Sequence, residues 1–67
     1  KGENKKFNLK ILTLVRVLYD YEPQGDEELE LAEGEIIPVI SDAEDPWWEG
    51  EKSGRTGMFP SNFVEKL

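Results

Sequence analysis

The segment Val17-Leu18-Tyr19-Asp20-Tyr21 places two tyrosines directly after a β-branched apolar run. Two further segments supply large rings or a proline: Trp47-Trp48, and residues 57–63, which read Gly-Met-Phe-Pro-Ser-Asn-Phe. A chain of only 67 residues cannot bury that many large rings in one core. Some of the rings must therefore be exposed together, and an exposed aromatic cluster is usually a binding surface. The sequence thus indicates a recognition module rather than a catalyst.

The composition excludes several classes of function. The chain is short enough to form one small domain, and it contains no cysteine and no histidine. Disulfides, thiolate metal sites and an imidazole general base are therefore absent, and we expect no catalysis, no metal and no cofactor. There is no apolar run of about 18 residues and no secretory signal pattern. Because the chain lacks an initial methionine, we expect an excerpt of a longer protein, and the absence of cysteine fits a reducing compartment such as the cytoplasm.

Charge is unevenly distributed along the chain. Residues 1–14 carry four lysines and one acid, a balance of +3, whereas residues 15–67 carry four basic residues and fourteen acids, a balance of −10; together these give the net charge of −7. A body this acidic repels nucleic acids and anionic membranes, so neither is expected as a partner. It attracts basic protein segments instead.

Five short strands separated by turn signals are predicted, with no long helical pattern. The strands span residues 15–18, 36–40, 47–52, 55–59 and 64–67, with a long acidic hairpin over residues 22–34, a tight turn over residues 53–54 and one 3₁₀ turn over residues 60–62. Pro38 has no backbone N–H, so we expect it to face solvent or a sheet edge. Short strands in a small chain imply an all-β barrel or two packed sheets. The predicted core consists of Val15, Val17, Leu29, Leu31, Ile37, Val39, Phe59 and Val64.

The opening segment is similar to the Ala-Leu-Tyr-Asp-Tyr signature of Src-homology-3 (SH3) domains. Other landmarks of that family follow in order and spacing: Glu28-Leu29, Gly34-Glu35-Ile36-Ile37, Trp47-Trp48, Gly57 and Pro60-Ser61-Asn62-Phe63-Val64. The resemblance covers residues 15–67 and leaves residues 1–14 as an N-terminal extension. It implies a small five-stranded, partly open SH3-type barrel with one 3₁₀ turn. It also implies an RT loop over residues 22–33, an n-Src loop over residues 41–46 and a distal turn over residues 53–54.

The same resemblance implies a monomeric, non-enzymatic module of signalling, cytoskeletal or endocytic adaptors, recruited to a membrane or to the cytoskeleton through its parent protein. Such a module binds proline-rich, Pro-x-x-Pro-type segments in the polyproline II conformation. Proline rings fit between aromatic walls, and the free carbonyls of the ligand accept hydrogen bonds from Trp and Tyr. Acidic loops beside the groove hold a flanking arginine or lysine. The implied peptide-binding residues are Tyr19, Tyr21, Asp26, Glu27, Glu28, Asp45, Trp47, Met58, Pro60, Asn62 and Phe63.

Alternation along a strand puts Trp47 and Trp48 on opposite faces. The family pattern assigns Trp47 to the groove, and we expect Trp48 on an outer surface of the sheet. Met58 stands where the family usually has an aromatic ring, so the pocket that it lines should be looser. Gly50 stands where the family often has a small apolar side chain, and we expect Phe59 to fill that space.

Two aromatic assignments have alternatives. Tyr19 and Tyr21 share one face of their strand and could be core residues, although the resemblance assigns them to the groove. Phe63 stands where most SH3 domains have tyrosine, which removes one hydrogen-bond donor to the ligand. The same replacement occurs in the minority of SH3 domains that bind ubiquitin through the groove, so ubiquitin is an alternative partner.

The role of the extension, residues 1–14, is also open. It is basic where the body is acidic, and Phe7, Leu9 and Ile11 alternate with polar residues, which suggests a strand. The extension could be a plain linker, a strand that packs on the barrel, or a docking segment.

Overall fold

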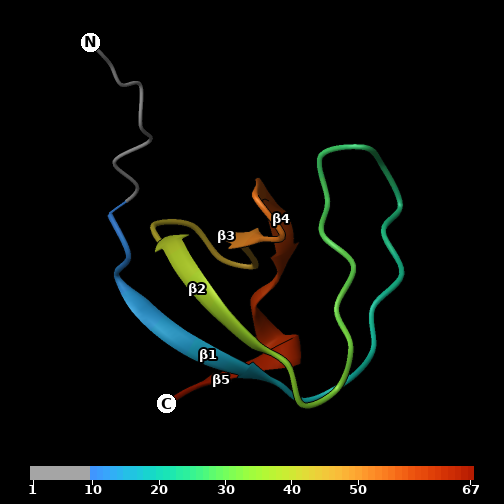
Figure 1. Cartoon of the computed structure of the whole chain (residues 1–67). Coiled ribbons are helices and arrows are strands. Elements are labelled where there is room, and N and C mark those ends of the chain that lie inside the picture. Colours follow the sequence, from blue (N-terminus) through green and yellow to red (C-terminus); the bar gives the residue numbers. More distant parts are fainter. Residues whose placement is uncertain (1–9) are drawn as a thin grey trace, which may run out of the picture.

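The computed structural model of this chain describes residues 10–67. Five antiparallel strands form one sheet in the order β4-β3-β2-β1-β5 (Figure 1). The elements are β1 (Thr13–Val17), β2 (Ile36–Ser41), β3 (Trp47–Lys52), β4 (Arg55–Pro60), the 3₁₀ turn η1 (Ser61–Phe63) and β5 (Val64–Lys66). The predicted five-stranded, partly open all-β fold is confirmed. The first strand begins two residues before the predicted start, and the 3₁₀ turn lies one residue later than predicted.

The core contains the eight residues that the sequence predicts. Each is at most 8% exposed, and they are Val15, Val17, Leu29, Leu31, Ile37, Val39, Phe59 and Val64. In the strands these residues alternate with exposed or half-buried ones, because successive side chains point to opposite faces of the sheet. Tyr21, Trp48 and Phe63 are partly buried and pack against this cluster.

The long segment between β1 and β2 is a hairpin, seen in green in Figure 1. Tyr21 and Leu31 exchange two backbone hydrogen bonds of 2.9 and 3.0 Å, which close the base of this hairpin. Its far arm pairs with β4, since the N–H of Leu29 donates to the carbonyl of Met58, and the N–H of Met58 donates to the carbonyl of Glu27, both at 2.8 Å. The hairpin therefore covers the β4 end of the sheet and holds its acidic tip beside that strand.

The expected edge position of Pro38 is wrong. Strand β2 lies inside the sheet, between β1 and β3, and Pro38 pairs with Leu14 of β1. The ladder between β2 and β3 pairs Val39 with Gly50 and then shifts register before Ser41. Pro38 thus precedes the first paired residue of that ladder, so its missing N–H does not interrupt the pairing.

The turn between β3 and β4 has the backbone that a two-residue hairpin requires. Ser53 has φ of 54° and Gly54 has φ of 83°, so both central residues lie in the left-handed region, as in a type I′ turn. The N–H of Gly54 donates to the Glu51 carboxylate at 2.8 Å. The predicted tight turn over residues 53–54 is therefore observed.

Most of the N-terminal extension, including Phe7 and Leu9 of the suggested strand, lies outside the described residues. Within the described part, Thr13 and Leu14 belong to β1. The N–H of Leu12 donates to the carbonyl of Val39 at 2.8 Å. The last three residues of the extension are thus hydrogen-bonded to, or part of, the barrel sheet.

Gly50 is buried where β3 crosses the core, and no space remains beside it. A Cβ atom at this position would lie 2.9 Å from Cγ2 of Ile37, 2.9 Å from Cε2 of Phe59 and 3.0 Å from the carbonyl oxygen of Pro38. The Phe59 ring therefore fills the space that a larger residue would occupy. The third contact is with the backbone of a neighbouring strand, which cannot rotate away.

We predict that Gly50→Ala lowers the free energy of unfolding by about 1–3 kcal/mol, because the added methyl overpacks the core. Urea denaturation of both proteins would measure the change. Glu49→Ala, on the same strand but the opposite face, is the matched control and should change stability by less than about 1 kcal/mol. A Gly50→Ala protein as stable as the original would show that the core can expand at this position.

Candidate functional site

Four aromatic side chains form a connected row, here called the aromatic row: Tyr19, Phe63, Tyr21 and Trp47. Phe63 lies between the tyrosines, with ring centroids 5.7 Å from Tyr19 and 5.4 Å from Tyr21, and Tyr21 lies 6.3 Å from Trp47. All three contacts are edge-to-face, which is a favourable arrangement for aromatic rings. Tyr19 is 59% and Trp47 is 38% exposed, so the row faces solvent.

Segments distant in the sequence bring these rings together. The two tyrosines follow β1, Trp47 begins β3, and Phe63 ends η1. The N–H of Leu18 donates to the carbonyl of Phe63 at 2.7 Å, which joins the end of η1 to the segment that carries the tyrosines. Trp47 pairs with Pro60 of β4, and Pro60 is buried beneath the row. Tyr21 packs partly on the core, whereas Tyr19 stands clear of it, so neither tyrosine is a fully buried core residue.

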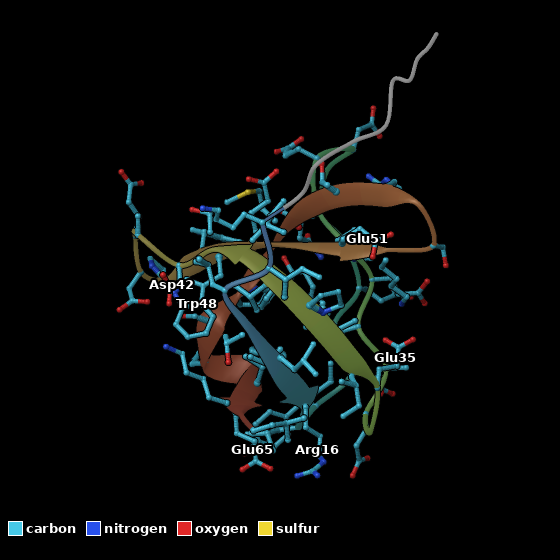
Figure 2. All side chains as sticks on the ribbon, turned by 60° about the vertical axis from the view of Figure 1, so that its left-hand side comes forward. Arg16, Glu35, Asp42, Trp48, Glu51 and Glu65 are labelled. Atoms are coloured by element: carbon cyan, nitrogen blue, oxygen red, sulfur yellow. The ribbon has the colours of Figure 1, made fainter. Side chains whose placement is uncertain are left out.

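The second tryptophan lies on the other face of β3. It shares that face with the buried Gly50, and it is half-buried and packs against the core instead of lying wholly on an outer surface. Its Nε1 donates to the Asp45 carboxylate at 2.8 Å, and the Lys66 ammonium lies 5.2 Å from its ring centroid. Figure 2 shows Trp48 beside Asp42, the residue that forms an ion pair with Lys66 at 3.2 Å. Trp48 is thus a structural residue.

Asp45 is one of the predicted peptide contacts, and in the structure its carboxylate accepts a hydrogen bond from Nε1 of Trp48. Besides Trp48, its carboxylate accepts a hydrogen bond of 3.3 Å from the Ser61 hydroxyl. These bonds join the loop before β3 to the start of η1. Both bonds fall on Oδ1, so the carboxylate has a structural role through that oxygen, and its role in ligand binding stays a prediction.

An acidic hollow adjoins the Trp47 end of the row and is lined by Glu27, Glu28, Trp47 and Met58. The pairing of the long hairpin with β4 creates it, because Glu28 forms a parallel bridge with Met58. Leu29 and Phe59 point inward at the same level, so Glu28 and Met58 point outward. Two carboxylates thus face an indole ring and a thioether across a small depression.

Glu28 is held by two donors at the same oxygen. Its Oε1 accepts hydrogen bonds of 2.7 Å from the Tyr21 hydroxyl and 2.7 Å from the backbone N–H of Gln24. The Gln24 bond, followed by the Tyr21 bond, lowers the pKa of Glu28 from its ordinary value. The bond to Glu28, then burial and the charge of the carboxylate, raises the pKa of the Tyr21 hydroxyl.

The remaining predicted contacts lie at the ends of the site. Asp26 is exposed at the tip of the hairpin and lines a second hollow with Glu28 and Arg55, and its carbonyl accepts a hydrogen bond from Arg55. Asn62 is exposed in η1 and directly precedes Phe63 of the aromatic row in the chain. The structure thus joins Tyr21 and Trp47 to the rest of the aromatic row and borders Trp47 with the acidic hollow. The binding roles of all the predicted site residues stay predictions.

Two residues near the site were not predicted. Gln24 holds Glu28 through its backbone, which no side-chain pattern reveals. Glu49 pairs with Met58 across β3 and β4 and lies on the same face of β3 as Trp47. The two-residue period of β3 could have identified Glu49, because it is two positions from Trp47.

Neither a metal site nor a membrane span is found in the described part of the chain. Residues 10–67 contain no group of three or more acidic side chains arranged to hold a metal ion. Over the same residues, no helix has the length and apolar character needed to cross a membrane.

Comparison with known proteins agrees with this geometry. The family model for the variant SH3 domain matches residues 17–65. The human SH3 domain-containing kinase-binding protein 1 is 54% identical over 52 residues, covering 78% of this chain and 8% of its own length. The Class E vacuolar protein-sorting machinery protein HSE1 of Pyricularia oryzae is 49% identical over 53 residues. The match covers 79% of this chain and 7% of the length of HSE1. This chain therefore spans less than a tenth of the length of these relatives.

A solved structure has the same fold. It is the C-terminal SH3 domain of myosin IB from Entamoeba histolytica, bound to the EhFP10(GEF) peptide, with a TM-score of 0.78 and 36% sequence identity. The match covers 87% of this chain and 95% of the other.

The bonds to Glu28 predict a pH dependence of stability. Because the pKa of Glu28 is lower in the folded than in the unfolded protein, its stabilisation is complete above the unfolded-state pKa and is lost as pH falls through the folded-state pKa. In Glu28→Gln this contribution is absent, so the stability difference between the two proteins should shrink as pH falls from 7 to about 3. Thermal melts across this range would measure it. Glu30→Gln, an exposed acid of the same loop, should show a smaller change with pH; an equal change would contradict the assignment.

Proposed function

The chain belongs to the SH3 domain family of protein-interaction modules, and we propose that it binds basic, proline-rich segments of other proteins along the aromatic row. The observation that carries the proposal is the row of four rings with an acidic hollow at its Trp47 end. Rings provide walls for prolines, and carboxylates provide a site for a flanking cation. The myosin IB SH3 domain, which is similar to this chain, has been solved with a peptide bound.

The row suits a polyproline II helix for physical reasons. This helix has three residues per turn and no internal hydrogen bonds, so its proline rings form ridges and its carbonyls are free to accept. Among residues 10–67, no hydrogen bond involves Nε1 of Trp47 or the hydroxyl of Tyr19, so both can donate to ligand carbonyls. Because the ligand helix is largely preformed, little ordering entropy opposes binding.

The acidic hollow takes the flanking cation of the ligand. A guanidinium can stack on the Trp47 ring while it bonds to the carboxylates of Glu27 and Glu28, so we expect arginine to bind more tightly than lysine. Met58 gives the hollow an adaptable wall in place of a flat ring. A shallow site of this size buries little surface, and we expect micromolar affinity.

A cellular role follows from the proposed binding of proline-rich segments. SH3 domains in general are not enzymes, and we propose that this one acts as a monomeric adaptor module in the cytoplasm. Relatives with matching domains include a kinase-binding protein and a component of vacuolar protein sorting. The protein that contains this chain would therefore recruit proline-rich partners in signalling, endocytic or cytoskeletal settings. The rest of that protein would determine its location in the cell.

We predict that Trp47→Ala weakens the binding of an arginine-flanked Pro-x-x-Pro peptide by at least about tenfold, because Trp47 is an aromatic anchor that borders both the row and the acidic hollow. Fluorescence or calorimetric titration would measure the dissociation constant. The control is Ile36→Ala, because Ile36 is an exposed apolar residue of β2 that does not belong to the row; it should bind like the original. Equal affinity of the Trp47→Ala protein would overturn the proposed site.

Ubiquitin is a second candidate ligand, and Phe63 is the observation that favours it. Phe63 lies at the centre of the row, in contact with both tyrosines, and offers an apolar edge without a hydroxyl. An apolar surface patch of another folded protein could cover such a ring without leaving a polar group unpaired.

We predict that Phe63→Tyr abolishes ubiquitin binding and preserves or strengthens peptide binding, because the added hydroxyl contributes about 0.5–1.5 kcal/mol to a peptide carbonyl. Amide shifts in separate NMR titrations of the variant with ubiquitin and with the peptide would show both the loss of ubiquitin binding and the retained peptide binding. Ubiquitin shifts that persist in Phe63→Tyr would contradict the ubiquitin proposal, and the peptide proposal would stand.

A further inference from the structure

The two oxygens of the Glu28 carboxylate have different surroundings. Oε1 receives the Tyr21 hydroxyl and the Gln24 N–H, both at 2.7 Å, which uses both of its lone pairs. No hydrogen bond or ion pair of residues 10–67 involves Oε2. Glu28 also borders the acidic hollow with Glu27, Trp47 and Met58. The carboxylate is thus fixed at one oxygen and available at the other.

We propose that Tyr21 is a positioning residue for ligand recognition: its hydroxyl, together with the Gln24 N–H, holds Glu28 so that only Oε2 meets the cation of the ligand. This inference rests on the proposed function and assigns a role to one hydroxyl of its site. Tyr21 can have this role because its ring is held on two sides, by Phe63 at 5.4 Å and Trp47 at 6.3 Å. A ring held in this way keeps its hydroxyl in one place.

The Tyr21 hydroxyl is therefore not a donor to the ligand. A phenol has one hydrogen to donate, and Glu28 takes it. The ligand carbonyls must rely on other donors, such as Trp47 and Tyr19. Removing the Tyr21 hydroxyl would leave the bonds to the ligand backbone in place, but Glu28 would then be held by the Gln24 N–H alone and would be less firmly fixed.

The occupied oxygen of Glu28 also limits how this carboxylate can bind an arginine of the ligand. A side-on guanidinium pair needs both oxygens of one carboxylate, and Oε1 of Glu28 is already occupied. The guanidinium of the ligand therefore makes one bond to Glu28 and finds its second acceptor in Glu27, which lines the same hollow. The ligand class is a proline-rich segment whose cation bridges two neighbouring carboxylates.

A double-mutant cycle between protein and ligand tests the proposal. The original protein and Tyr21→Phe are each titrated with an arginine-flanked Pro-x-x-Pro peptide and with the same peptide carrying neutral citrulline. We expect Tyr21→Phe to weaken the arginine peptide about three- to tenfold and the citrulline peptide less than about twofold. Tyr19→Phe is the matched control, since it also removes one hydroxyl of the row, and it should affect both peptides alike. Equal losses for both peptides in Tyr21→Phe would overturn the positioning role.

A second readout needs no ligand. The pKa of the Glu28 carboxyl, followed by NMR in the free protein, should rise in Tyr21→Phe, while amide spectra confirm that the variant is folded. An unchanged pKa would show that the hydroxyl does not hold Glu28, and the inference would fail even if peptide binding stands. If the original protein binds neither peptide, the proposed function fails, and the Glu28 titration alone decides whether Tyr21 positions this carboxylate.

Discussion

The close approach of the long hairpin to β4 is the contact on which the rest of the site depends. Two backbone hydrogen bonds tie Met58 to Glu27 and Leu29, and they bring the carboxylates of the hairpin beside Trp47. This approach requires a glycine at position 57, because a Cβ there would lie 2.9 Å from the side chain of Leu29 and 3.0 Å from the carbonyl oxygen of Glu27. One residue without a side chain therefore sets the distance between the acidic and aromatic parts of the binding surface.

The proposed binding surface is also an extension of the core. A domain of this size has a small core, and Tyr21 and Phe63 pack against it with one side of their rings and line the aromatic row with the other. The same packing that stabilises the barrel thus holds the rings in place before any ligand arrives. A surface that needs little rearrangement loses less entropy on binding, which matters for a ligand that buries a small area.

No ion pair within residues 10–67 neutralises the negative charge of the acidic hollow. Arg16, Lys52 and Lys66 are each paired with a carboxylate elsewhere on the barrel, and Figure 2 shows the pair of Arg16 with Glu65 at the β5 end of the sheet. Among residues 10–67, no cation pairs with the carboxylates of Glu27 or Glu28. Such a field attracts basic segments and raises their association rate, most strongly at low ionic strength.

Local patterns in the sequence predict the strands, the core and the residue types of the site, whereas the partners of these residues depend on the folded chain. Core positions such as Val15 and Val17 follow from a two-residue period, and the turn at residues 53–54 follows from local backbone preference, so neighbours in the chain are sufficient to predict them. The interior place of Pro38, the packing of Trp48 on the core and the two donors at Glu28 were decided only in the folded chain. Each depends on strand order or on contacts between distant segments, and a single sequence does not contain these pairings in any local pattern.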